Sequence, residues 1–204
     1  DCWRRAAAET GGEAQTELFA LDALLRERGE EIQEAMGWLA PPEAARAIEP
    51  LETLAQCEAL SLEARVACLR ALLRLNSVSK VREILARLDS AALNASPPGR
   101  LFAREFWRGE IRRRLVTGEY AAALEAIERL RLHDAEAGRA HEALLHLSRI
   151  GEAREEGRLL DALRIALRDL LPALPEVGRN RLESLLKDLP AWAAGPAAPP
   201  GRFD

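Results

Sequence analysis

Residues 115–130 read LVTGEYAAALEAIERL, and this stretch decides the fold class. On both sides of Gly118 most residues are unbranched helix formers, which lose little side-chain freedom in a helix. Gly118 adopts a left-handed backbone conformation without strain, so it can end one helix while Tyr120 begins the next. The small side chain of Ala123 then lets the two helices approach closely. The stretch therefore predicts two helices joined by a turn of a few residues.

The same composition extends over the chain of 204 residues. Apolar residues make up 48% and charged residues 30% of the sequence, as in folded proteins, whereas aromatic residues make up 4%. The predominance of Leu, Ala, Glu and Arg over β-branched and aromatic residues favours helix over strand. We expect an all-α protein without a sheet.

Turn-forming residues recur along the chain and leave segments of about ten to twenty residues, the ordinary length of globular helices. Helices of this length that are joined by short turns run antiparallel. The sequence thus predicts a series of antiparallel helix hairpins. The expected breaks are Gly11-Gly12, Pro41-Pro42, near Ser61, Asn76-Ser77, Pro97 to Gly99, Gly118, near Gly138, Gly157, Pro172 to Pro175, and Pro190.

Three of these turn residues are evenly spaced. Asn76 and Gly118 are 42 residues apart, Gly118 and Gly157 are 39 apart, and a similar apolar pattern follows each of them. This period lies in the range of helix-hairpin repeats. We therefore expect the hairpins to stack as a short α-solenoid.

Part of this repeat resembles a known family, the tetratricopeptide repeat. That repeat has a Trp on its first helix, a Gly-x-Tyr turn, a small residue three positions on and then a large apolar residue, matched here by Trp107, Gly118, Tyr120, Ala123 and Ile127. Two departures are Ile111, where a small residue is usual, and the missing proline after Leu130.

A second and poorer copy of the repeat follows, and a third around Asn76 keeps the apolar spacing alone. The second copy has Gly157, Leu159, Ala162 and Ala166, with Pro175 near its end. The resemblance covers residues 101–171. It implies a right-handed stack with a concave surface that binds a segment of another protein.

This organisation divides the chain into three parts. We expect residues 1–60 to form a helical region that caps or joins the stack. The resemblance implies that residues 61–192 form tetratricopeptide-like repeats, closed by a helix from Glu176 to Leu189. Residues 193–204 are rich in Pro and Ala and are expected to be a linker or a disordered tail.

A looser resemblance covers more of the chain. The order of LFALDALLRERGEEIQEAMGWL (18–39), RAIEPLETLAQCEAL (46–60) and AALEAIERL (122–130) resembles the helical repeats appended to bacterial eukaryotic-like serine/threonine kinases. It implies a non-catalytic interaction or sensory module of a larger bacterial signalling protein, with a protein or peptide partner. The alternative is a structural or accessory scaffold subunit of a multiprotein complex. The oligomeric state stays open.

Catalytic and metal motifs are not expected. His141 and His146 are five residues apart, which turns them roughly 140° away from each other on a helix, whereas zinc-protease histidines are four apart and share a face. His133 adds no ligand spacing, and no glycine-rich phosphate loop is present. We therefore predict no enzyme activity, no metal and no cofactor.

The charges of the chain exclude some partners and suggest one surface. The net charge is −4 with mixed signs, which gives no general attraction to nucleic acid, and no apolar run is long enough to enter a membrane. A stripe of arginines four residues apart could hold an acidic peptide or a carboxylate terminus. The alternative is a solvated face neutralised by neighbouring glutamates. The stripe consists of Arg100, Arg104, Arg108 and Arg112.

Two cysteines flank the expected turn near Ser61. In an antiparallel hairpin, Cys57 and Cys68 would lie at similar heights and could form a disulfide, whereas the alternative is a pair of free, small core residues. A disulfide would imply an oxidising, extracytoplasmic compartment, and free thiols would fit the cytoplasm. The sequence leaves the compartment open.

Overall fold

The computed structural model describes residues 13–180, most of which are helical, with no strand among them. The expected all-α class is confirmed. The chain divides into two compact units, and the boundary lies between Phe106 and Trp107, inside helix α8 (Pro97–Val116). Residues 176–180 are helical, as expected for the start of the closing helix. The rest of that helix and the tail 193–204 lie outside the described residues.

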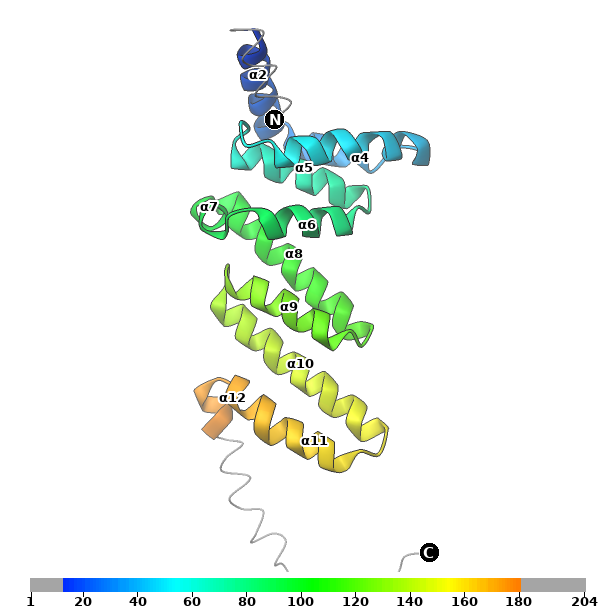
Figure 1. Ribbon diagram of the computed structural model, residues 1–204, viewed down its shortest axis with the longest axis vertical. Helices are drawn as coiled ribbons and strands as arrows, with labels where there is room; N and C mark the ends of the chain where they lie inside the picture. Colours follow the sequence, from blue (N-terminus) through cyan, green and yellow to red (C-terminus); the bar gives the residue numbers. More distant parts are fainter. Residues whose placement is uncertain (1–12, 181–204) are drawn as a thin grey trace, which may run out of the picture. The chain divides into compact units, whose positions relative to one another are not determined.

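Helix α5 (Leu62–Arg74) is the centre of the first unit (Figure 1). It packs against four other helices of this unit, and a short helix, α7 (Ser90–Ala95), precedes α8. Six residues of α5 are buried, more than on any of its neighbours, because α5 is covered on several sides. Its neighbours are α2 (Glu13–Glu27), α3 (Gly29–Met36), α4 (Pro41–Gln56) and α6 (Val78–Arg87).

The helix starts in this unit follow from local chemistry. Pro41 and Pro42 open α4, where the missing backbone N–H costs nothing. Ser61 is the N-cap of α5, and its Oγ accepts a hydrogen bond from the Ala64 N–H at 3.3 Å. The Ser61 N–H donates to Asp22 Oδ1 at 2.6 Å, which ties α2 to the start of α5. The expected breaks at Pro41-Pro42 and Ser61 are confirmed.

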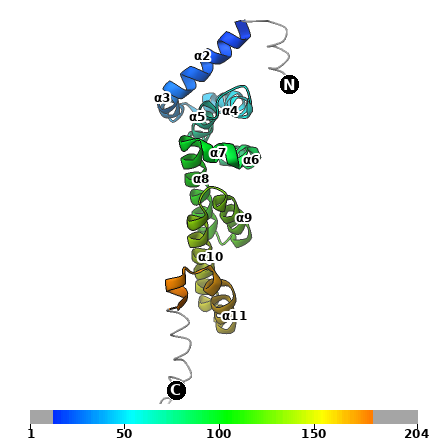
Figure 2. The same cartoon turned by 90° about the vertical axis from the view of Figure 1, so that its left-hand side faces the viewer.

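The second unit contains the end of α8 and a zigzag of helices in which α10 packs against both α9 and α11. Figure 2 shows α9 and α11 on the same side of α10. Its interior includes Ile127 and Leu130 of α9, which are fully buried, and Leu170, which packs near Ala143 of α10. The helices are α9 (Tyr120–Arg131), α10 (Ala135–Glu155), α11 (Leu159–Ile165), the π-helical turn η1 (Ala166–Leu170) and α12 (Leu171–Ala173).

Three helix connections have the same backbone conformation. Asn76, Gly118 and Gly157 have φ of 57°, 72° and 74°, the left-handed region that ends a helix. In each, the next residue donates its N–H to a carbonyl five residues earlier: from Ser77 to Leu72 at 3.0 Å, from Glu119 to Arg114 at 2.8 Å, and from Arg158 to Ala153 at 2.7 Å. The left-handed turn predicted at Gly118 is confirmed, with matching turns at the predicted spacing.

The residue that starts the next helix is set by the same connection. Ser77, Glu119 and Arg158 have ψ of 49°, 60° and 62°, close to an inverse γ-turn. Helices α6, α9 and α11 therefore begin two residues after each left-handed residue. The sequence repeat is thus a repeat of helix connections, and the stacking of the hairpins as a solenoid stays a prediction.

Two expected breaks are displaced. The break expected at Pro97 to Gly99 lies at Ser96, because α8 already begins at Pro97. The turn expected near Gly138 lies at Asp134, the N-cap of α10, whose Oδ1 accepts from the Ala137 N–H at 3.0 Å. Gly138 is buried inside α10, where a Cβ would lie 2.3 Å from Cγ of Arg131. This glycine therefore permits close approach of α10 to the end of α9 and does not form a turn.

Candidate functional site

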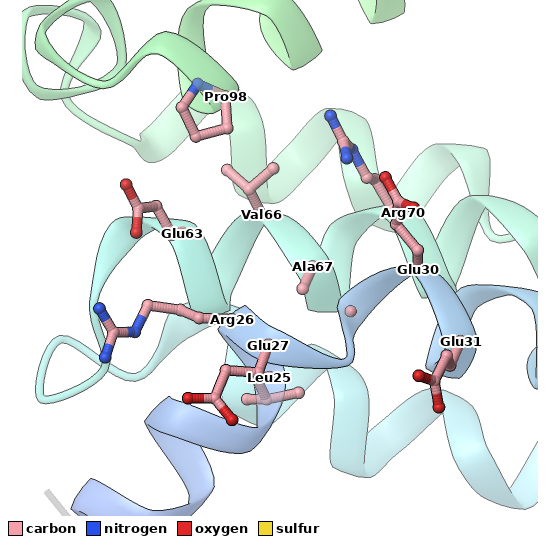
Figure 3. A pocket seen from close by; sticks show the side chains of 11 residues that line it. Leu25, Arg26, Glu27, Glu30, Glu31, Glu63, Val66, Ala67, Arg70 and Pro98 are labelled. Carbon is pink, nitrogen blue, oxygen red and sulfur yellow. The ribbon is translucent and has the colours of Figure 1, made fainter.

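The first unit contains a hollow of about 370 Å³ (Figure 3). One wall is a face of α5 that carries Glu63, Val66, Ala67 and Arg70, whose spacing of three and four residues places them on the same side of a helix. The end of α2, the start of α3 and Pro98 of α8 complete the lining. We call this site the acidic hollow, for the charges described below.

The base of the acidic hollow is apolar and is shaped by a close helix contact. Leu25 and Val66 are 4% and 2% exposed and form its floor with Ala67. Gly29, the first residue of α3, lies beside Ala67, and a Cβ on Gly29 would be 3.0 Å from the Cβ of Ala67. A larger residue at either position would push α3 away from α5 and change the shape of the hollow.

The rim of the hollow carries four carboxylates and two guanidiniums. Two of these charges are neutralised by neighbours: Arg26 pairs with Asp22 at 3.1 Å, and Glu31 pairs with Arg28 at 2.5 Å. Four lining charges make no ion pair with another described residue, and three of them are carboxylates. The unpaired groups are Glu27, Glu30, Glu63 and Arg70. The remaining field in the hollow is therefore negative.

Figure 3 shows how these groups are distributed. Val66 and Ala67 lie in the middle of the lining, with Glu63 to one side and Arg70 to the other. The seven-residue spacing between Glu63 and Arg70 corresponds to a rise of about 10 Å along α5. The hollow thus offers an apolar patch with charged groups at both ends.

The sequence contained the α5 part of this site but gave no reason to single it out. The spacing of Glu63, Val66, Ala67 and Arg70 is that of an ordinary amphipathic helix face. The site forms when α2 and α3 fold against α5, and that packing has no local sequence signal.

The predicted arginine stripe lies on α8, and its four members differ in their surroundings. Arg100 and Arg112 are exposed, while Arg104 and Arg108 are half-buried. Nη2 of Arg108 lies 3.3 Å from Oδ2 of Asp134, the N-cap of α10. Arg108 therefore already has a structural partner. Binding of an acidic peptide by the stripe stays a prediction.

The arginines that follow the stripe are neutralised locally. Glu110 is buried, and its carboxylate lies 3.2 Å from Nε of Arg113 and 3.5 Å from Nε of Arg114. Arg114 is itself buried and also approaches Glu119 at 3.9 Å. This part of α8 matches the alternative interpretation, in which glutamates neutralise the arginines.

Cys57 and Cys68 are free thiols in the structure, so the disulfide considered from the sequence is not formed. Cys57 is the C-cap residue of α4, whereas α5 begins at Leu62 and Cys68 lies six residues further on, a rise of about 9 Å. That rise exceeds the Cα separation of roughly 7 Å that a disulfide can bridge. The expectation of similar heights was wrong because Cys57 lies in the connection itself.

The thiol of Cys68 is also chemically suppressed. Its side chain is fully buried on the inner face of α5, and this burial raises its pKa to about 12. A thiol with such a pKa is almost entirely protonated near neutral pH and is a poor nucleophile. Cys68 is therefore a core residue.

The histidines do not converge on a shared site. The ring of His141 lies 2.7 Å from the Ala137 carbonyl through Nδ1, while His146 is buried in the second unit. Burial lowers the pKa of His146, and this shift is partly opposed by Asp169 and Glu142. Among residues 13–180 no group of three His, Cys, Asp or Glu side chains is arranged to hold a metal ion.

The second unit has an exposed apolar face on α11 and η1, which we call the leucine face. Its four leucines are 41–74% exposed, whereas Ala162 and Leu170 of the same segment are buried. Patches of exposed apolar side chains often mark protein contacts. The leucine face consists of Leu159, Leu160, Leu163 and Leu167.

None of the helices in the described part of the chain combines the length and apolarity that a bilayer span requires. No protein-family model, curated protein or solved structure matches the chain. The structure by itself therefore defines the class, an all-α protein whose helices are joined by repeated left-handed turns.

Proposed function

We propose that the chain is a non-catalytic protein-interaction module that binds a segment of another protein in the acidic hollow. The observation that supports this most is the combination of an apolar floor with unpaired charges on the rim. Its volume is at the lower end of ligand sites, which span roughly 300–1,000 Å³. A site of this size takes a few side chains of a partner.

The helix connections are consistent with such a role. Short turns between helices leave long helix faces exposed, and proteins built from helix hairpins use such faces to bind other proteins. Attachment to a larger bacterial signalling protein, as the kinase-associated repeats imply, is part of this proposal and is carried by the sequence resemblance.

The proposal can be tested by locating bound peptides on the full chain. A panel of short capped peptides with acidic, basic and uncharged side chains would be titrated into protein with labelled Leu, Val and Ile methyl groups. Binding in the hollow should shift the resonances of Leu25 and Val66. Those of Ile127 and Leu130, in the interior of the second unit, serve as the control and should stay unchanged. A panel in which no peptide shifts Leu25 or Val66 would refute the proposed site.

The leucine face supports a second candidate function, a scaffold subunit whose apolar surface is permanently covered by a neighbouring chain. Four leucines exposed within nine residues are costly for a surface that always faces water. Light scattering of the isolated chain over a wide concentration range tests this candidate. Concentration-dependent association that Leu160→Ser plus Leu163→Ser removes would support it, and a soluble monomer at all concentrations would contradict it.

A further inference from the structure

We infer that the segment recognised by the acidic hollow is basic, with an arginine or lysine on each side of an apolar side chain. This inference rests on the function proposed above and adds the chemistry of the partner. It differs from the acidic partner expected for the arginine stripe of α8.

The charge balance of the lining is the first argument. After the internal pairs of Arg26 and Glu31 are set aside, three carboxylates and one guanidinium remain without a partner among the described residues. Exposed carboxylates on both sides of a concave surface add their fields there and attract cations. A cationic side chain would gain charge-assisted hydrogen bonds with Glu27, Glu30 or Glu63.

The apolar floor is the second argument. Val66 and Ala67 separate Glu63 from the far end of the lining (Figure 3), so a partner with charge alone would leave this patch in contact with water. An aliphatic side chain between two cations would cover the patch, with one cation toward Glu63 and the other toward Glu30. Figure 3 shows Glu30 on the same side of the patch as Arg70, so its carboxylate offsets the positive charge of Arg70 there. The stems of arginine and lysine are themselves apolar and can lie along Leu25 or Pro98 while their charged ends reach the rim.

The length of the hollow limits the size of the motif. About 10 Å along α5 corresponds to roughly three residues of extended chain, and alternate residues of an extended chain point to the same side. A sequence of the type Arg-x-Leu-x-Arg therefore presents a cation, an apolar group and a cation to one surface. The five-residue motif is slightly longer than the hollow, and the flexible arginine side chains can fold inward to make up that difference.

The experiment uses three capped peptides that differ at the charged positions alone: Arg-Ala-Leu-Ala-Arg, Gln-Ala-Leu-Ala-Gln and Glu-Ala-Leu-Ala-Glu. Each is titrated into the full chain, and affinity and the Leu25 and Val66 methyl shifts are recorded at low and high salt. We expect the arginine peptide to bind most tightly and to lose affinity with salt, because ion pairs at an open site are screened.

Two sets of variants with equal changes in net charge identify the carboxylates. Glu27→Gln, Glu30→Gln and Glu63→Gln together should weaken the arginine peptide about tenfold, the sum of three exposed ion pairs of ordinary strength. Glu43→Gln, Glu49→Gln and Glu83→Gln together are the control, since these exposed glutamates of the first unit do not line the hollow. The control should bind within about twofold of the unmodified chain.

The outcomes separate the two proposals. Equal shifts of Leu25 and Val66 with all three peptides would overturn the basic partner and leave the interaction module in place. If the glutamate peptide bound most tightly and shifted Leu25 and Val66, the basic partner would likewise be overturned and the interaction module would remain. Equal weakening by the two triple variants would also overturn the inference, because net charge and not the hollow would then control binding. Absence of any shift at Leu25 and Val66 would overturn both proposals.

Discussion

Two glycines on the same helix should respond in opposite ways to replacement by alanine. Gly138 and Gly151 both lie within α10. A Cβ on Gly151 would have no neighbouring atom within 4 Å, whereas a Cβ on Gly138 would lie 2.3 Å from Cγ and 3.3 Å from Cα of Arg131. We expect Gly151→Ala to stabilise the chain and Gly138→Ala to destabilise it.

The magnitudes follow from the two sites. Alanine is about 1 kcal/mol better than glycine within a helix, so Gly151→Ala should raise the free energy of unfolding by about that amount. Gly138→Ala gains the same helix propensity but must displace Arg131, which pairs with Glu128 at 2.6 Å and with Glu142 at 2.5 Å. Overpacking costs roughly 1–3 kcal/mol and each partly exposed pair up to about 1 kcal/mol. The net loss should be about 1–3 kcal/mol.

Urea and thermal unfolding followed by circular dichroism at 222 nm measure this difference. A separation of about 2–4 kcal/mol between the two variants corresponds to several degrees in Tm for a chain of this size. The combination of Gly138→Ala with Arg131→Ala provides an internal check, because removal of the Arg131 side chain beyond Cβ relieves the shortest contact. The double variant should be more stable than the sum of the single effects predicts.

One result would refute this reasoning. If Gly138→Ala is as stable as Gly151→Ala, α10 does not approach the end of α9 as closely as the structure shows. Destabilisation by Gly138→Ala that Arg131→Ala leaves unchanged would instead show that the strain lies in the backbone contact with Arg131 and not in its side chain.

Three further predictions concern single side chains. Burial lowers the pKa of His146 below 6.5, so the unfolded state takes up a proton first as the pH falls. The wild-type chain should therefore lose stability below about pH 6.5 more steeply than His146→Leu. Identical slopes of stability against pH in the two chains would contradict this. In a Cys2→Ser background, Cys57 should react with a thiol reagent at pH 8 in the folded chain. Cys68, whose pKa is raised to about 12, should react only after unfolding, and rapid reaction of both thiols in the folded chain would be the contrary result. Asp134→Ala removes the N-cap bond of α10 and the partner of Arg108, and should lower the free energy of unfolding by about 1–2 kcal/mol in urea titrations, whereas an unchanged midpoint would show that the cap is dispensable.

The sequence predicted well those features that depend on a few neighbouring residues. The left-handed turn at Gly118 could be inferred because glycine is nearly alone in adopting that conformation without strain. The start of α5 at Ser61 could be inferred because a serine side chain satisfies a free N–H in the first turn. Both effects act within one helix end and need no tertiary contact.

The same local reasoning failed where two helices meet. The sequence predicts a turn near Gly138, whereas in the structure this glycine leaves room for Arg131 of the preceding helix. The prediction of similar heights for Cys57 and Cys68 is wrong because the sequence does not show at which residue each helix ends. An error of a few residues in a boundary moves a side chain by a turn of helix, which is enough to exclude a disulfide.

The candidate site shows the same division. The four arginines of the stripe lie on α8, as their spacing predicts. Only the packing of α8 beside the start of α10, however, brings Arg108 to Asp134. The acidic hollow had no counterpart in the sequence, because its lining comes from α2, α3, α5 and α8, and unpaired charge is a property of their arrangement.

The sequence by itself determined that the chain is helical and where its left-handed turns fall, since backbone conformational preference is a property of each residue and its nearest neighbours. Tertiary structure alone decided which helix faces are covered, which carboxylates stay unpaired and which cysteine is buried. Those outcomes depend on distances between residues far apart in the chain, and burial and electrostatic pairing act through such distances.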